Sequence, residues 1–322
     1  MEPIRLELPT GWAMGPVNAY LFTQPEIILV DAGLKTADCW AALVDGLAAQ
    51  GVAVGDIARV VITHPHVDHY GLAGRIVAES DATVWIYEAG APWLSATGGM
   101  WAARHAYYRD TFLPRLGLPP ATAEMTLAGL RGLASLADPV PDERVVTFHP
   151  GGRLQMGGQA WDIHHAPGHA GTQTIFHQPE TRRLLSADML LAVTPTPVIE
   201  HPPPGQSRRS PSLPLFLDSL DRVEALDVAM VYPGHGRPFG DPRRVINRQR
   251  ERIRSRKAEC LALIRAGRTT VPDLLDGMYA HQPPESRLAG LWMLVGYLDL
   301  LLAEGAVDEA EVDGVGHYRI KK

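Results

Sequence analysis

The stretch "VITHPHVDHYGLAG", residues 61–74, places three histidines and one aspartate within six residues, directly after an apolar run. Imidazole and carboxylate groups are ligands that suit a borderline divalent metal such as zinc. In an extended loop alternate residues point the same way, so His64 and His66 would share one ion while Asp68 and His69 turn toward a second. A polar surface loop with scattered histidines is the alternative, and this density of ligand groups disfavours it.

Three later positions offer further ligands. His169 lies in the turn "HAPGHAGT", Asp188 follows the strand-like "RRLLSA", and His235 lies in "VYPGHG". Each comes at the C-terminal end of an apolar run, where α/β proteins gather functional groups. His164 and His165 lie beside the first of these turns and stay open as alternatives to His169.

The pattern H-x-H-x-D-H, followed in order by these three positions, resembles the metallo-β-lactamase superfamily of binuclear hydrolases over about residues 15–240. The resemblance implies an α+β fold, a four-layer αββα sandwich with the metals at one sheet edge. It implies that Asp31, in "VDAG", supports the metal loop from behind. It also implies the ligands: His64, His66 and His169 for one zinc, Asp68, His69 and His235 for the other, and Asp188 as the bridge between them.

Two divalent metals about 3.5–4 Å apart can share a water and lower its pKa toward neutrality. A metal-bridging hydroxide is then the expected nucleophile, and no serine or cysteine is needed. We expect Asp68 to be catalytic as well as a ligand, because it can accept the proton of the water and deliver it to the leaving group. The cofactors are two Zn²⁺ by the resemblance, although these Asp and His ligands also tolerate iron or manganese.

The chain has 322 residues, about right for two domains. We predict a catalytic domain at residues 1–242, with an aromatic-rich helical insertion at about 90–140 that either packs on the core or covers a pocket as a lid. Residues 243–322 read as three helices and a hairpin around Asp313-Gly314, similar to the winged-helix tail of a superfamily branch that includes an endoribonuclease. Such a tail also serves as a packing or dimer domain, which is compatible with a homodimer.

Composition narrows the class of protein. The net charge of −6 does not favour a nucleic-acid partner. We see no signal peptide and no apolar run near the roughly 20 residues that span a bilayer, so we expect a cytoplasmic enzyme without a membrane partner. Cys39 and Cys260 lie in helix-like segments and are expected to be buried thiols rather than a disulfide.

Three functions from different classes follow. The favoured one is hydrolysis of a small-molecule ester, thioester or lactone, because residues 93–112 would give an apolar wall for an acyl group. An endoribonuclease or phosphodiesterase acting on single strands is the alternative, since eight Lys or Arg residues lie between Arg243 and Lys257. The third is a non-catalytic DNA-binding regulator. The proline-rich loop 195–214, with Arg208 and Arg209, either borders the pocket and meets an anionic substrate group or is an exposed loop.

Overall fold

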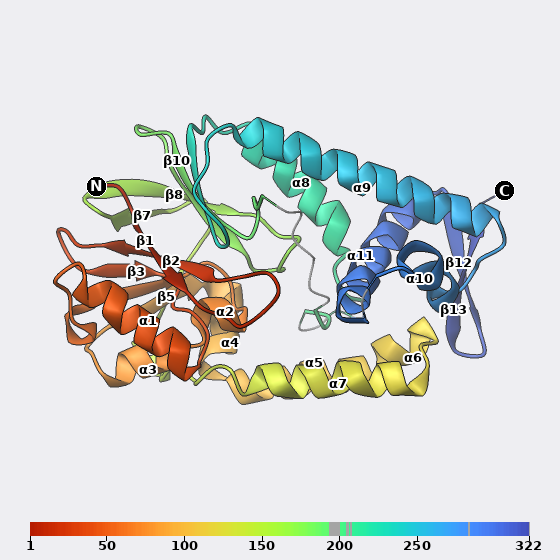
Figure 1. Cartoon of the computed structure of the whole chain (residues 1–322), viewed down its shortest axis with the longest axis horizontal. Helices are drawn as coiled ribbons and strands as arrows, with labels where there is room; N and C mark the ends of the chain where they lie inside the picture. Colours follow the sequence, from red (N-terminus) through yellow and green to blue (C-terminus); the bar gives the residue numbers. More distant parts are fainter. Residues whose placement is uncertain (193–199, 204–205, 207, 283, 322) are drawn as a thin grey trace.

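The computed structural model describes residues 1–192, 200–203, 206, 208–282 and 284–321. Two β-sheets face each other at one end of the molecule, and a helical half extends from them (Figure 1). The first sheet has six strands in the order of the chain, with β3 to β6 parallel. Its strands are β1 (Ile4–Leu8), β2 (Val17–Phe22), β3 (Ile28–Val30), β4 (Arg59–Ile62), β5 (Thr83–Tyr87) and β6 (Val145–Phe148).

The second sheet has the order β11-β10-β9-β8-β7, and only its β10–β11 pair is parallel. Aromatic side chains fill the space between the sheets, where Phe22 packs edge-on against Trp161 and Phe148 against Phe176. Each such fully buried side chain contributes about 1.5–3 kcal/mol to folding. The strands are β7 (Arg153–Met156), β8 (Gln159–His165), β9 (Thr174–Gln178), β10 (Arg183–Ala187) and β11 (Met230–Pro233).

Helices cover the outer faces of both sheets. Helices α1 (Ala37–Ala48) and α3 (Ala73–Ala78) lie on the first sheet, and α8 (Ser212–Glu224) lies beside the second (Figure 1). Helix α1 begins where the sequence indicates, because the Thr36 side chain accepts a hydrogen bond from the Cys39 amide. The predicted αββα sandwich is confirmed.

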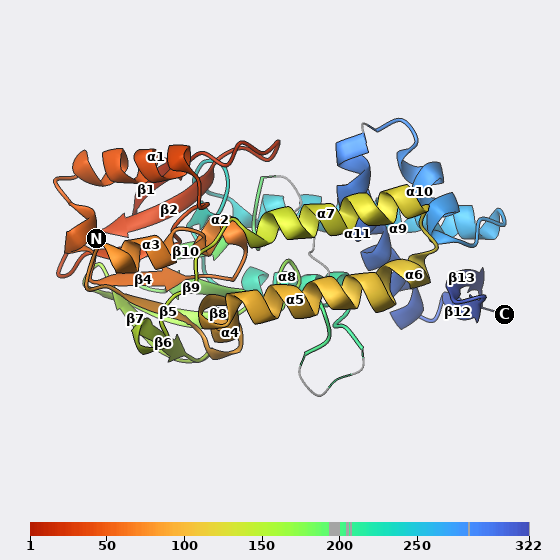
Figure 2. The same ribbon diagram turned by 90° about the horizontal axis from the view of Figure 1, so that it is seen from below.

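The insertion is a helical excursion whose two long helices lie side by side (Figure 2). Its far end reaches the C-terminal region, where Arg115 forms an ion pair of 3.0 Å with Glu309, and Tyr108 and Phe112 pack on Trp292. The insertion therefore packs on more than the sandwich. Its helices are α4 (Ala91–Ser95), α5 (Thr97–Tyr107), a π-helical turn (Tyr108–Phe112), α6 (Leu113–Leu116) and α7 (Pro120–Ala134).

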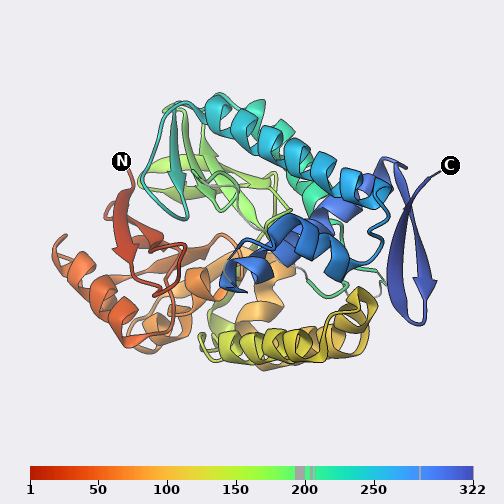
Figure 3. The ribbon, with the colours of Figure 1, turned by 45° about the vertical axis from the view of Figure 1, so that its right-hand side comes forward.

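The C-terminal segment is built as predicted, from three helices and a hairpin (Figure 3). Thr270 caps its second helix by accepting a hydrogen bond from the Asp273 amide. The hairpin turns at Asp313 and Gly314, both with positive φ, as a tight two-residue turn requires. The winged-helix likeness and the boundary at residue 242 stay predictions. The elements are α9 (Pro242–Arg265), α10 (Val271–Tyr279), α11 (Pro284–Ala303), β12 (Val307–Val312) and β13 (Val315–Ile320).

Three smaller expectations can be compared with the structure. Cys39 and Cys260 are buried free thiols, as predicted. Among the described residues, none of the helices is both long and apolar enough to cross a membrane. In the loop 195–214, residues 195–199, 204–205 and 207 lie outside the described residues. Arg209 does not face a pocket for an anion, because it forms a two-pronged ion pair with Asp299 of α11 at 2.7 and 2.8 Å.

Candidate metal centre

All seven predicted ligands gather at one edge of the sandwich. They follow the C-terminal ends of β4, β8, β10 and β11. At this edge two hydrogen bonds join the sheets: the Thr174 amide donates to the Thr63 carbonyl, and the Asn18 amide donates to the Gly234 carbonyl. Parallel and adjacent strands that end together bring distant parts of the sequence to one place. Of the seven side chains, only that of His66 is half-buried. The six buried ones are His64, Asp68, His69, His169, Asp188 and His235.

The first group of ligands consists of three imidazoles. His66 Nδ1 lies 3.0 Å from His64 Nε2 and 2.9 Å from His169 Nε2. Nitrogens bound at about 2.0–2.1 Å around one tetrahedral ion lie roughly 3.3–3.4 Å apart, so this spacing needs only a small expansion. The three residues form a group that could hold one metal ion.

The second group contains Asp68, His69 and His235. His235 Nε2 lies 3.4 Å from Asp68 Oδ2, and His69 Nε2 lies 3.9 Å from the same oxygen. Asp188 lies between the two groups, since its Oδ2 is 3.4 Å from His169 Nε2 and 3.6 Å from His235 Nε2. One carboxylate thus reaches both sets of imidazoles, as a bridging ligand must.

The outward nitrogens of three imidazoles have fixed partners. His64 Nδ1 faces Thr63 Oγ1 at 2.9 Å, His69 Nδ1 faces Asp31 Oδ2 at 2.8 Å, and His235 Nδ1 faces the Pro16 carbonyl at 2.9 Å. These contacts assign the ring proton to Nδ1 and leave the Nε2 lone pair pointing inward.

Buried polar atoms normally have a hydrogen-bond partner. In the described part of the chain, His69 Nε2, His235 Nε2 and Asp188 Oδ1 are buried without one. A cation between them would satisfy all three, because Asp188 Oδ1 presents a lone pair and each imidazole Nε2 presents one once the cation displaces its proton. The chemistry of this donor set therefore fits divalent metal ions.

Asp31 supports the loop from behind, as the sequence suggests. Its carboxylate accepts hydrogen bonds from the Thr63 amide and hydroxyl as well as from His69. The residue has a positive φ of 60°, which a short polar residue tolerates better than most. Thr63 is a functional residue that the sequence reasoning missed, although its place directly before His64 was a signal for it.

The surroundings shift the pKa values of the imidazoles in different directions. Burial, together with His69 and His66, holds the pKa of His64 well below its usual value. Burial opposes the charge on His69 as well, but the carboxylates of Asp31, Asp188 and Asp68 raise its pKa well above the usual value. Despite burial, the imidazoles of His235, His69 and His169 hold the pKa of Asp188 well below its usual range. Asp188 is therefore an anion, which suits it to face cations.

The extended-loop expectation for residues 64–69 is wrong in its second half. After His66 the chain forms one helical turn, α2 (Val67–Tyr70), whose first backbone bonds run back to the His66 carbonyl. Successive residues of a helix are rotated by about 100°, so Asp68 and His69 diverge without an extended backbone. The helical turn still places Asp68 and His69 close to His235, the third member of the second group.

The histidines beside His169 are not part of this centre. His165 Nε2 faces the Gly171 carbonyl at 2.8 Å. His164 belongs to a different cluster, with Asp162 and His177. Of the three candidates, His169 lies with the other predicted ligands, and its role as a ligand stays a prediction.

Gly234 is a second residue that the sequence reasoning missed. A Cβ built on it would lie 2.1 Å from Asp188 Oδ1 and 2.9 Å from His69 Cε1. Any side chain here would therefore displace the Asp188 carboxylate. The signal was present as a Pro-Gly pair directly before His235 in "VYPGHG".

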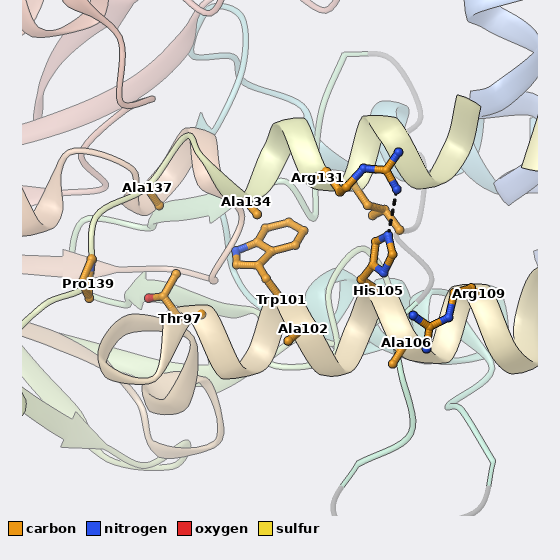
Figure 4. Close-up of a pocket in the computed structure, with 12 residues that line it drawn as sticks. Thr97, Trp101, Ala102, His105, Ala106, Arg109, Arg131, Ala134, Ala137 and Pro139 are labelled. Atoms are coloured by element: carbon orange, nitrogen blue, oxygen red, sulfur yellow. Dashed lines mark hydrogen bonds between the residues drawn. The ribbon is translucent and has the colours of Figure 1, made fainter. Parts of the chain in front are cut away.

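Beside the centre, the insertion contributes aromatic rings and a hollow. Trp101 Nε1 lies 3.4 Å from Tyr70 Oη, and Tyr70 directly follows His69. The hollow has a volume of about 700 Å³ and lies between α5 and α7, with the Trp101 ring facing Ala134 across it (Figure 4). Its lining, within the described ranges, includes none of the seven ligands. The hollow shares Trp101 with the contact to Tyr70, and it does not contain the centre.

Comparison with known proteins agrees with this geometry. The model of the Metallo-beta-lactamase superfamily matches residues 12–235, more than half of the chain. The chain belongs to the metallo-β-lactamase superfamily. It is 28% identical over 308 residues to the probable metallo-hydrolase YqjP of Bacillus subtilis (strain 168), covering 95% of this chain and 94% of that protein.

Two solved structures resemble nearly the whole chain. A metallo-beta-lactamase family protein from Thermus thermophilus is 26% identical, covers 99% of this chain and 98% of its own, and has a TM-score of 0.76. A beta-lactamase domain protein from Burkholderia ambifaria is 22% identical, covers 98% and 90%, and has a TM-score of 0.79. The second likeness is one of fold, and it extends through the C-terminal segment.

Proposed function

We propose that this protein is a metal-dependent hydrolase that holds two divalent ions, zinc by family resemblance, and cleaves a small-molecule ester, thioester or lactone. The observation that carries the proposal is the position of Asp188, which lies within 3.6 Å of imidazoles from both ligand groups. Membership of the superfamily and the likeness to a probable metallo-hydrolase support it.

When bound, two such ions supply a water of lowered pKa as the nucleophile and polarise the scissile oxygen. His64, His66 and His169 would hold one ion, and Asp68, His69 and His235 the other. Asp188 would hold both, since its low pKa keeps it charged. Asp31 and Thr63 fix the rings of His69 and His64 in the tautomer that presents Nε2.

Asp68 has a second role in this proposal. Its buried carboxylate faces His235 Nε2 at 3.4 Å, so one oxygen can stay with the ligand set while the other accepts a proton from the attacking water. The same oxygen then delivers the proton to the leaving group. The thiols take no part, because burial raises the pKa of Cys39 to about 11 and that of Cys260 to about 12.

The preference for an acyl substrate rests on the surroundings of the centre. Trp93 and Trp101 pack edge-on at 5.5 Å beside Tyr70, and the hollow next to them is lined mainly by apolar side chains. Apolar lining with few polar groups is typical of sites for small molecules. In contrast, three of the α9 cations that a nuclease would need, Arg250, Arg254 and Lys257, are already paired with acidic side chains.

A substrate panel tests the proposal. Zinc-loaded protein is assayed on an acyl thioester, a lactone, bis(p-nitrophenyl) phosphate and single-stranded RNA, with protein stripped of metal as the control. Turnover of the thioester or lactone without RNA cleavage supports the proposal. RNA cleavage that is lost on neutralising Arg250, Arg254 and Lys257 would establish the nuclease instead, and tight duplex-DNA binding without turnover would establish the regulator.

The role of Asp68 is tested by Asp68→Asn. The variant keeps an oxygen for the ligand set but cannot accept the proton, so we expect a loss of turnover of about 10²–10⁴-fold. Metal content per chain is measured on the same sample. Full turnover with both metals retained would rule out the proton-transfer role.

A further inference from the structure

A second cluster of side chains that can bind metal lies on the outer face of the second sheet, the face directed away from the core between the sheets. Trp161 and Ile163 of β8 point into the core between the sheets, so Asp162 and His164 point the other way. On β9, His177 is paired directly opposite Asp162. Side chains opposite each other in an antiparallel pair lie on the same face. The register therefore places all three on one surface.

The donor atoms of this cluster are close enough to share an ion. One ligand atom from each of Asp162, His164 and His177 lies within 4.8 Å of the other two. Ligands bound at about 2.0–2.2 Å around one tetrahedral ion lie roughly 3.3–3.6 Å apart, so side-chain rotations that move these atoms by about 1–1.5 Å complete the set. Two imidazoles and a carboxylate suit zinc and its neighbours in the first transition row rather than magnesium or calcium.

Each member is also held as a ligand would be held. His177 Nε2 donates to the Asp227 carbonyl at 3.1 Å, which leaves the Nδ1 lone pair available. His164 Nε2 is buried and has no hydrogen-bond partner among the described residues. Asp162 Oδ1 accepts a bond of 2.6 Å from Arg153 Nε, which orients the carboxylate and leaves its second oxygen available.

We propose that Asp162, His164 and His177 form a further site for one zinc-class divalent ion, separate from the centre at the sheet edge. The site joins β8 to β9, and the turn between these strands carries His169. With three protein ligands and a water completing its coordination, a bound ion here would clamp β8 to β9 at the base of the hairpin whose turn carries His169, a predicted ligand of the main centre. The proposal does not rest on the proposed hydrolase function, since none of its three residues belongs to that centre.

The test counts zinc ions in the full chain, with Zn²⁺ alone as the probe. Wild type, His164→Gln and His177→Gln are loaded with excess zinc, desalted, and measured by elemental mass spectrometry. Each variant is expected to hold one zinc fewer per chain than wild type, with turnover within about twofold. The matched control is His317→Gln, a histidine of the C-terminal hairpin, which keeps the wild-type count. Equal counts in wild type and both variants would overturn the proposal.

Three further measurements keep the result decisive. If either glutamine variant folds poorly by circular dichroism, Asp162→Asn replaces it, and a wild-type zinc count in that folded variant overturns the site. Asp188→Asn distinguishes the two centres, because it should remove turnover but keep the ion that His164→Gln removes. We also expect zinc to raise the melting temperature of wild type more than that of His164→Gln, and equal increases would count against a structural ion.

Discussion

The edge of the sandwich and the surface of α9 are both crowded with ionisable residues, but their side chains differ in whether they have partners. At the edge, His69 Nε2, His235 Nε2 and Asp188 Oδ1 are buried without a hydrogen-bond partner in the described chain. On α9, Arg250 pairs with Asp221 and Glu224, and Lys257 pairs with Glu304. In sequence, each region is only a cluster of charges.

This difference gives a criterion that distinguishes a functional site from an ordinary charged surface. Burying a polar atom without a partner costs free energy, so an array of such atoms implies an absent group that satisfies them. A cation that already has a carboxylate partner on the surface is accounted for, and phosphate would have to displace that carboxylate. The half-buried pair Arg209–Asp299 adds the intermediate case, in which charges are partly removed from water and satisfied by each other.

The largest effect is expected from Asp188→Asn, which removes the charge that faces both ligand groups. We expect turnover to fall by at least about 10⁴-fold, equivalent to roughly 5.5 kcal/mol, and metal content to fall with it. Steady-state kinetics and elemental analysis measure the two effects. Asp218→Asn, at an exposed position on α8, is the matched control. Wild-type turnover in Asp188→Asn would contradict the inference that buried atoms without hydrogen-bond partners mark the metal centre.

The next effect is on stability. Asp299→Asn leaves the half-buried Arg209 beside a neutral amide, so we expect the free energy of unfolding to fall by about 1.5–3 kcal/mol. Urea unfolding of metal-stripped protein measures it, which keeps metal binding out of the comparison. Glu251→Gln, in an exposed ion pair with Arg254, is the control and should cost about 0–1 kcal/mol. Equal losses in the two variants would show that burial does not distinguish these pairs.

A smaller loss is expected from Asp31→Asn, because Asp31 acts through other residues. Without its carboxylate, His69 loses the acceptor that fixes its Nδ1 proton, and zinc affinity should fall by about 10–100-fold. Competition with a chromogenic chelator gives the affinity. Asp45→Asn, on the exposed face of α1, should leave it unchanged. An unaltered affinity in Asp31→Asn would show that Thr63 alone positions the loop.

The fold could be predicted because many of its signals are local and repeated, whereas the set of seven predicted ligands came from the family resemblance. The apolar run before His64 predicts a buried strand, and Thr36, Thr270 and Asp313-Gly314 mark caps and a turn by their own chemistry. Each of these features depends on residues within a few positions of one another.

What could not be predicted depends on distant partners. Nothing in the sequence near Arg209 shows that Asp299, 90 residues later, neutralises it. The same holds for Gly234, whose lack of a side chain matters only because Asp188 lies beside it. The helical turn at Val67–Tyr70 was missed because four residues are too few to show helical periodicity.

The smallest effect is expected from Arg254→Gln on α9. Arg254 is exposed and pairs with Glu251 three residues before it, so its removal should change the free energy of unfolding by less than about 1 kcal/mol and leave turnover unchanged. Fluorescence anisotropy with single-stranded RNA, measured across a salt series, tests the alternative. If Arg254 contacts a phosphate, its replacement would weaken RNA binding. The slope of log affinity against log salt concentration would also become shallower by about one unit. Such a reduction would place α9 among the functional surfaces, because it would show that the partner of a paired cation can be exchanged for a phosphate.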